Sequence, residues 1–139
     1  MIILDPISAL DPGVFVSSNV SEAAEPAAYN AGTSYAAEAR VRNPTTHFIY
    51  ESKVAANLGN ALTDTTKWLP IGYTNRYKML DQYNNTQTEN AESIVLELKS
   101  PGISRGLYLG NLDAYSVTVE ITDDTEGLVY SETQNLAIA

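Results

Sequence analysis

Apolar and polar residues alternate most regularly in the last third of the chain. The segments 94–98 and 115–121 place apolar side chains at every second position, and the second segment has serine, threonine and glutamate between them. This period of two residues is typical of a strand with one face in water. The segment TDDTEG at 122–127 then predicts a hairpin turn into a strand over 128–131. We predict an antiparallel sheet here, as part of a jelly-roll-like β-sandwich.

The predicted sandwich is incomplete within these 139 residues. A sandwich has about six to eight strands, and residues 69–139 offer fewer. The missing strands would come from the preceding part of the chain, from residues beyond 139, or from a neighbouring chain. This shortage of strands indicates a protein that assembles with others.

The sequence pattern in the middle of the chain predicts a small β unit without a helix. Short strands are expected over 40–42 and 48–52, separated by an Asn-Pro turn. An irregular loop then returns to Trp68. Farther on, the polar segment 84–90 cannot bury itself and is expected to be a surface loop.

The first residues differ from the rest, because LDP occurs twice and is followed by GVFVSSNV. Proline disfavours both helices and central strands, so we predict an extended arm with a short strand near 14–16. Its apolar side chains would pack either on their own domain or on a partner. For the second alternative, the expected assembly contacts are Ile2, Ile3, Leu4, Val14 and Phe15.

The fold class is therefore all-β, in three parts. An extended arm over 1–27 precedes a small three-stranded unit over 28–70. A portion of a β-sandwich over 71–139 follows.

The charge of the chain excludes several kinds of partner. With a net charge of −9 and eight scattered basic residues, the chain is not expected to bind nucleic acid or an anionic membrane surface. No window approaches the roughly 18 consecutive apolar residues of a membrane span, so no membrane insertion is expected. The start of the chain lacks the pattern of a signal peptide. The absence of cysteine excludes disulfides and thiolate chemistry.

Catalytic chemistry has few candidate residues. His47 is the single histidine, and no nucleophile–base motif accompanies it. Asp123, Asp124 and Glu126 are crowded in one turn and lack the spacing of an EF-hand. No pair of carboxyl groups stands out for glycan cleavage. We predict that the protein is not an enzyme and has no metal and no cofactor.

Aromatic residues are concentrated between positions 29 and 83. Rings of this kind stack on sugar faces or pack on one another. We interpret Tyr35, Tyr50 and Trp68 as packing residues. If the unit binds a glycan of a host surface, the candidate contacts are Tyr29, Tyr73, Tyr77 and Tyr83.

Residues 29–68 resemble the small chitin-binding type of carbohydrate-binding module. The resemblance rests on GTSY at 32–35, on Val41 and Tyr50, and on the closing Trp68. In that family the tyrosine of GT-x-Y and the closing tryptophan support the fold, while exposed rings bind sugar. Two positions depart from the pattern. Glu38-Ala39 stand where Gly-Asp is expected, and Tyr29 replaces the leading tryptophan.

The whole chain resembles a family of tailed-bacteriophage virion proteins. Three segments carry the resemblance: VSSNVSE at 16–22, WLPIGYTNRYKMLD at 68–81 and LYLGNLDAYSVTVEITDDTEGLVY at 107–130. It implies a structural component of the tail, its tip or its fibres, assembled in the host cytoplasm. The implied partners are other tail proteins and further copies of this chain.

The 68–81 segment is expected to join two β units. Trp68 would close the first unit, and the following residues would lead into the second. Arg76 and Asp81 are available for an ion pair that fixes this joint.

Overall fold

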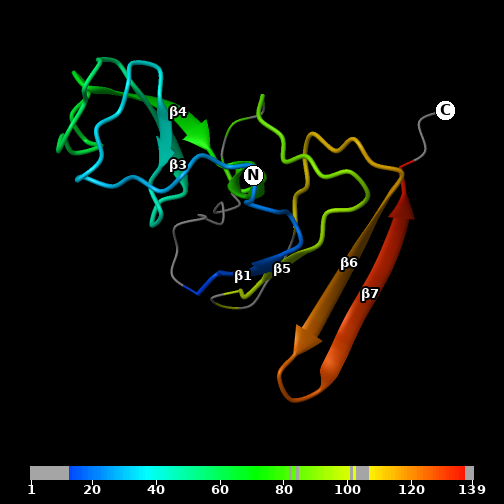
Figure 1. Cartoon of the computed structure of the whole chain (residues 1–139). Helices are drawn as coiled ribbons and strands as arrows, with labels where there is room; N and C mark the ends of the chain where they lie inside the picture. Colours follow the sequence, from blue (N-terminus) through cyan, green and yellow to red (C-terminus); the bar gives the residue numbers. More distant parts are fainter. Residues whose placement is uncertain (1–12, 82, 84, 101, 103–106, 137–139) are drawn as a thin grey trace, which may run out of the picture. The chain divides into compact units, whose positions relative to one another are not determined.

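The computed structural model describes residues 13–81, 83, 85–100, 102 and 107–136, and its architecture is all-β as predicted (Figure 1). The described residues contain one helix, α1, which is only four residues long. The elements in chain order are β1 (Phe15–Ser18), β2 (Arg40–Arg42), β3 (Phe48–Ser52), β4 (Trp68–Tyr73), α1 (Asn75–Lys78), β5 (Leu96–Leu98), β6 (Ser116–Asp123) and β7 (Gly127–Asn135).

The chain divides into two compact units, Met1–Leu107 and Tyr108–Ala139. The expected boundaries at 27/28 and 70/71 both fall inside the first unit. We refer to these as the first unit and the hairpin unit, and describe each by itself.

The first unit contains an antiparallel sheet in the order β2-β3-β4. The two strands predicted over 40–42 and 48–52 are confirmed with those bounds, and Trp68 begins the third strand. Val41 is opposite Tyr50, and Ser52 is opposite Trp68. Val41, Ser52 and Trp68 are each almost fully buried, so this face of the sheet is the core face.

The turn between β2 and β3 is held by its own asparagine. The Asn43 side-chain oxygen accepts hydrogen bonds from the backbone N–H groups of Thr45 and Thr46, an arrangement that asparagine favours in turns. His47 ends the turn with a positive φ of 55°, and its backbone N–H donates to the Asn43 carbonyl. This turn directs the His47 side chain towards the N-terminal segment.

A second sheet of the first unit pairs β1 with β5, which lies some 80 positions later in the sequence. Phe15 is opposite Leu98, and Ser18 is opposite Leu96. Just past the strand, the Asn19 side chain accepts from the Val95 N–H and donates to the Ser93 carbonyl. The short strand expected near 14–16 is therefore present and belongs to the first unit.

The hairpin unit contains β6 and β7, joined by the predicted turn (Figure 1). Asp123 accepts hydrogen bonds from the N–H groups of Thr125 and Glu126, and Gly127 has a positive φ of 78° at the start of β7. We expected β5 to share a sheet with these strands, but it pairs with β1 instead. The sandwich itself stays a prediction.

Candidate functional site

The segment Thr74–Tyr77 lies where several parts of the first unit meet. Thr74 is fully buried, and its N–H donates to the His47 carbonyl in the turn after β2. Tyr77 is 6 % exposed and stacks on the His47 ring with 3.8 Å between centroids. Phe15 of β1 approaches the same tyrosine at 4.9 Å. These contacts bring β1, the 43–47 turn and α1 into one packed junction.

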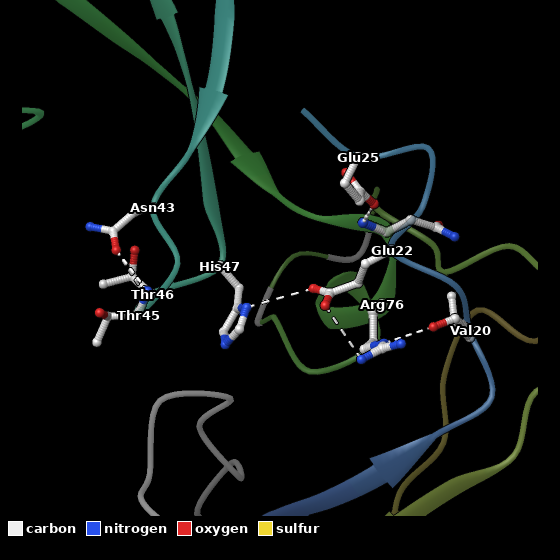
Figure 2. A network of polar contacts seen from close by, with 9 residues as sticks. Val20, Glu22, Glu25, Asn43, Thr45, Thr46, His47 and Arg76 are labelled. Carbon is white, nitrogen blue, oxygen red and sulfur yellow. Dashed lines mark hydrogen bonds and ion pairs between the residues drawn. The ribbon is translucent and has the colours of Figure 1, made fainter. Parts of the chain in front are cut away.

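Arg76 connects this junction to the N-terminal segment (Figure 2). Its Nε donates to the Val20 carbonyl at 2.7 Å, and its guanidinium approaches a Glu22 carboxylate oxygen at 3.4 Å. Both charged side chains are only about a quarter exposed. A charge-assisted bond of this kind is stronger in partial burial than at a free surface. Arg76 therefore fixes the chain around residues 20–22.

Glu22 also faces His47, whose Nδ1 is 3.7 Å from the second carboxylate oxygen. Neither of these two atoms has a hydrogen-bond partner, and both are buried. Burial is the main cause that lowers the pKa of His47 below its ordinary value of 6.5. Glu22 acts in the opposite direction, while Arg42 and Arg76 lower this pKa further. Burial thus favours the neutral form of His47, although a carboxylate lies beside it.

The other side of the junction is closed by residues of the polar 85–93 segment. Asn75 exchanges two hydrogen bonds with the backbone of Glu89, and its N–H donates to the Glu25 carboxylate. The Thr88 hydroxyl donates to the Asn75 carbonyl and accepts from the Met79 N–H. The segment expected to be a surface loop is therefore partly built into the junction, and Thr88 is buried.

The contacts of this junction hold segments of the first unit together. Within the described ranges, no group of three or more histidine, cysteine, aspartate or glutamate side chains could hold a metal ion. The ionisable groups pair with one another or with backbone groups, and aromatic rings cover them. This geometry fixes the relative positions of β1, α1 and the sheet.

Of the three rings predicted to pack, Tyr35 and Trp68 pack together with Tyr29, while Tyr50 lies against Phe48 at 5.6 Å. Tyr29 and Tyr35 stack at 6.0 Å, and each meets the Trp68 indole edge-on. The Tyr29 hydroxyl and the Trp68 Nε1 both donate to the Asn60 carbonyl. The polar groups that a sugar would need are therefore already bonded inside the protein. Tyr29, a candidate sugar contact, belongs to this core.

The other candidate sugar contacts lie in separate places. Tyr73 packs edge-on against Phe48 at 4.9 Å, and Tyr77 is buried in the junction. Tyr83 is 66 % exposed. The structure does not bring these rings together on one surface.

The expected ion pair between Arg76 and Asp81 is wrong. Arg76 pairs with Glu22, while the Asp81 carboxylate accepts from the Thr86 hydroxyl and the Tyr83 N–H. Residues five positions apart do not share a helix face, and α1 ends at Lys78. Glu22 was not selected from the sequence. It is one of four acidic residues in the predicted arm over 1–27, and the sequence does not distinguish it from the others.

The proposed assembly contacts fall into two groups. Ile2, Ile3 and Leu4 lie outside the described residues. Val14 is 6 % exposed, and Phe15 packs on Tyr77. Val14 and Phe15 therefore belong to the core of their own unit, as the first alternative for the arm predicts.

The hairpin unit exposes an apolar surface, and none of the site residues predicted from the sequence lies on it. The direct pairings place Val117, Val119 and Ile121 on one face, together with Tyr130 and Glu132. Every residue of β7 is exposed, and large apolar side chains remain in water on both sides of the turn. The strict alternation of apolar residues over 115–121 could have indicated this surface, because it places the apolar side chains on one face of the strand.

No family model, curated protein or solved structure matches this chain. Among the described residues, no helix is long and apolar enough to cross a membrane.

Proposed function

We propose that this protein is a non-enzymatic structural component of a phage virion, in the tail, the tail tip or the fibres, where it joins neighbouring subunits. The observation that carries the proposal is the hairpin unit. Its strands β6 and β7 pair only with each other among the described residues. The large apolar residues Ile121, Leu128, Val129 and Tyr130 are exposed. A two-stranded hairpin is marginally stable by itself in water, so this unit needs a partner surface.

The edges of the hairpin support the same role. Proteins that avoid edge-to-edge association place lysine or proline on exposed edge strands. Neither residue occurs in β6 or β7. Unpaired backbone groups on such an edge can add a strand from a partner. The protein thus has both an apolar face and open strand edges for assembly.

The site in the first unit supports a structural role. The junction around Arg76 and Tyr77 uses its polar groups to hold its own segments together. A rigid unit of this kind is suited to carry an interaction surface, because its segments have few ways to move apart.

Immunogold labelling of purified virions tests the proposal. Antibodies raised against the chain should label the tail of particles of the phage that encodes it. Absence of label from intact particles, with the chain abundant in the infected cell, would reject a virion role.

A second candidate function is binding of a host surface glycan. The exposed Tyr83 ring favours it, since flat rings stack on sugar faces. Titration with oligosaccharides should then change tyrosine fluorescence, and Tyr83→Ala should remove the change. No response in either protein would leave assembly as the remaining function.

A further inference from the structure

The charges of the chain are divided unevenly between its two units. The hairpin unit, residues 108–139, contains six of the 17 acidic residues and none of the eight basic ones. Its net charge is therefore −6 out of the chain's −9. Two hairpin units placed face to face would bring twelve like charges together and repel each other, so a basic surface suits one of them better than a second hairpin unit does.

The first unit has such a surface on the outer face of its three-stranded sheet. Arg40 and Arg42 alternate with the buried Val41, so they lie on the face opposite the core. Glu51 of β3 lies between Arg40 of β2 and Leu69 of β4, and all three are on this outer face. The outer face therefore combines arginines with an exposed leucine.

Two lysines extend this face past the strand ends. The Lys53 N–H donates to the Lys67 carbonyl, which continues the pairing of β3 with β4 by one step. Lys67 precedes Leu69 by two positions and so follows the same side of the strand. We call this surface the basic sheet face. It consists of Arg40, Arg42, Glu51, Lys53, Lys67 and Leu69, together with Ile71 at the neighbouring bulge.

The composition of the basic sheet face complements that of the hairpin unit. It holds four of the chain's eight basic residues and one acidic residue. Leu69 and Ile71 are each 44 % exposed. An exposed apolar centre bordered by cations matches an exposed apolar face bordered by carboxylates.

We propose that the hairpin unit of one copy docks on the basic sheet face of a second copy. Val119, Ile121 and Tyr130 would cover Leu69 and Ile71 of the second copy, and Glu132 would lie near its lysines. Such a contact uses two different surfaces, so it joins copies head to tail and can extend to a ring or a filament. This inference rests on the proposed assembly role and names the partner of the hairpin unit.

The test uses the full chain and two charge-reversal variants. Lys67→Glu changes the basic sheet face, and it should not harm the fold because it places a carboxylate opposite Lys53. Glu132→Lys changes the hairpin face at an exposed strand position. Glu92→Lys has the same change in charge as Glu132→Lys but lies outside both surfaces, so it serves as the control.

Light scattering and sedimentation give the mass of each protein over a range of concentrations. The intact chain and Glu92→Lys should associate, and about 1 M salt should weaken this association by shortening the Debye length to about 3 Å. Each single variant should associate at least about tenfold more weakly, a difference of one decade in Kd.

Mixing the two variants gives the decisive result. The intact hairpin of Lys67→Glu can dock on the intact sheet of Glu132→Lys. The reverse contact brings the two substituted positions together with their charges exchanged, so the two charges attract again. The mixture should therefore associate more strongly than either variant alone. A monomeric intact chain at about 100 μM, or a mixture that stays monomeric, would overturn the proposal. Tail labelling of virions together with a monomeric chain would retain the assembly role and identify another protein as the partner.

Discussion

Glu38 has a backbone conformation that suits glycine better than glutamate. Its φ is 67°, in the left-handed region that costs a residue with a side chain about 1–2 kcal/mol. Glu38 nevertheless keeps this conformation because its N–H donates to the Ser52 carbonyl at 2.7 Å. The resemblance to the chitin-binding type of module expects glycine at this position. The conformation that such a glycine would favour is thus present here without the glycine.

Glu38→Gly should raise the free energy of unfolding by about 0.5–1 kcal/mol, because relief of backbone strain exceeds the added entropy of the unfolded chain. Urea denaturation followed by tryptophan fluorescence measures the change. Ala37→Gly is the matched control, since Ala37 does not have a positive φ and its replacement should destabilise the protein. Equal effects of the two substitutions would contradict the argument.

His47 makes stability depend on pH in a defined direction. Because its pKa in the folded protein is lowered from 6.5, the unfolded chain binds the proton more tightly. The stabilising contribution is therefore complete above pH 6.5 and is lost as the pH falls through the lowered pKa. The slope for one proton is at most about 1.4 kcal/mol per pH unit. Asp64 and Asp123, whose pKa values are lowered from 3.8 by hydrogen bonds, act only at lower pH.

The prediction is that stability falls between about pH 7 and pH 5 in the wild-type protein, and much less in His47→Asn. Asparagine is suited to this site because it tolerates the positive φ that His47 adopts. Urea denaturation at a series of pH values gives both slopes. A wild-type slope that the substitution leaves unchanged would assign the pH dependence to other groups.

Two ion pairs of the first unit show how position decides the energy of a contact. Arg40 and Glu51 are 2.9 Å apart across β2 and β3, but the Arg40 side chain is 57 % exposed. Arg76 and Glu22 are farther apart, at 3.4 Å, yet both are largely covered, and Arg76 also bonds the Val20 carbonyl. The longer pair joins two elements and is expected to matter more.

Arg76→Ala should destabilise the protein by about 2 kcal/mol, because it leaves the Glu22 carboxylate and the Val20 carbonyl without their donor. Arg40→Ala should cost about 0–1 kcal/mol, the usual range for an exposed pair. Chemical denaturation of both variants measures the difference. A larger loss for Arg40→Ala would show that distance outweighs burial here.

Local elements were predictable from the sequence, while their partners were not. The strands over 40–42 and 48–52 follow from apolar spacing and an Asn-Pro turn, which are local signals. The pairing of Phe15 with Leu98 depends on two short strands that are 83 positions apart, and no local pattern encodes that choice. The Glu22–Arg76 pair was not predicted for the same reason, since many carboxylates of the chain could have paired with this arginine.

On the scale of the whole molecule, the N-terminal segment has two parts with different expected roles. Residues 13–20 contribute Val14 and Val20 to the core and β1 to a sheet. Deletion of residues 1–20 should therefore lower the free energy of unfolding by at least about 3 kcal/mol through lost core packing. Deletion of residues 1–12 keeps every described contact of β1, so any loss of stability beyond that of this shorter deletion is due to residues 13–20.

The same pair of deletions tests the assembly contacts proposed at Ile2, Ile3 and Leu4. If the chain without residues 1–12 folds but loses its oligomeric mass, these residues join subunits. An unchanged mass would restrict assembly to other surfaces, the hairpin unit foremost among them.

The two units should differ in their stability against local opening. β3 is the central strand of a sheet with a buried face, so its amides should exchange slowly at every protein concentration. The amides of β6 and β7 belong to a two-stranded hairpin with exposed side chains and should exchange rapidly in dilute solution. Hydrogen exchange at low and high concentration compares them directly. If a second copy covers the hairpin, its exchange slows as concentration rises, and it stays fast in Lys67→Glu. Slow exchange at every concentration would mean instead that the hairpin needs no partner, because contacts within one chain would already protect it.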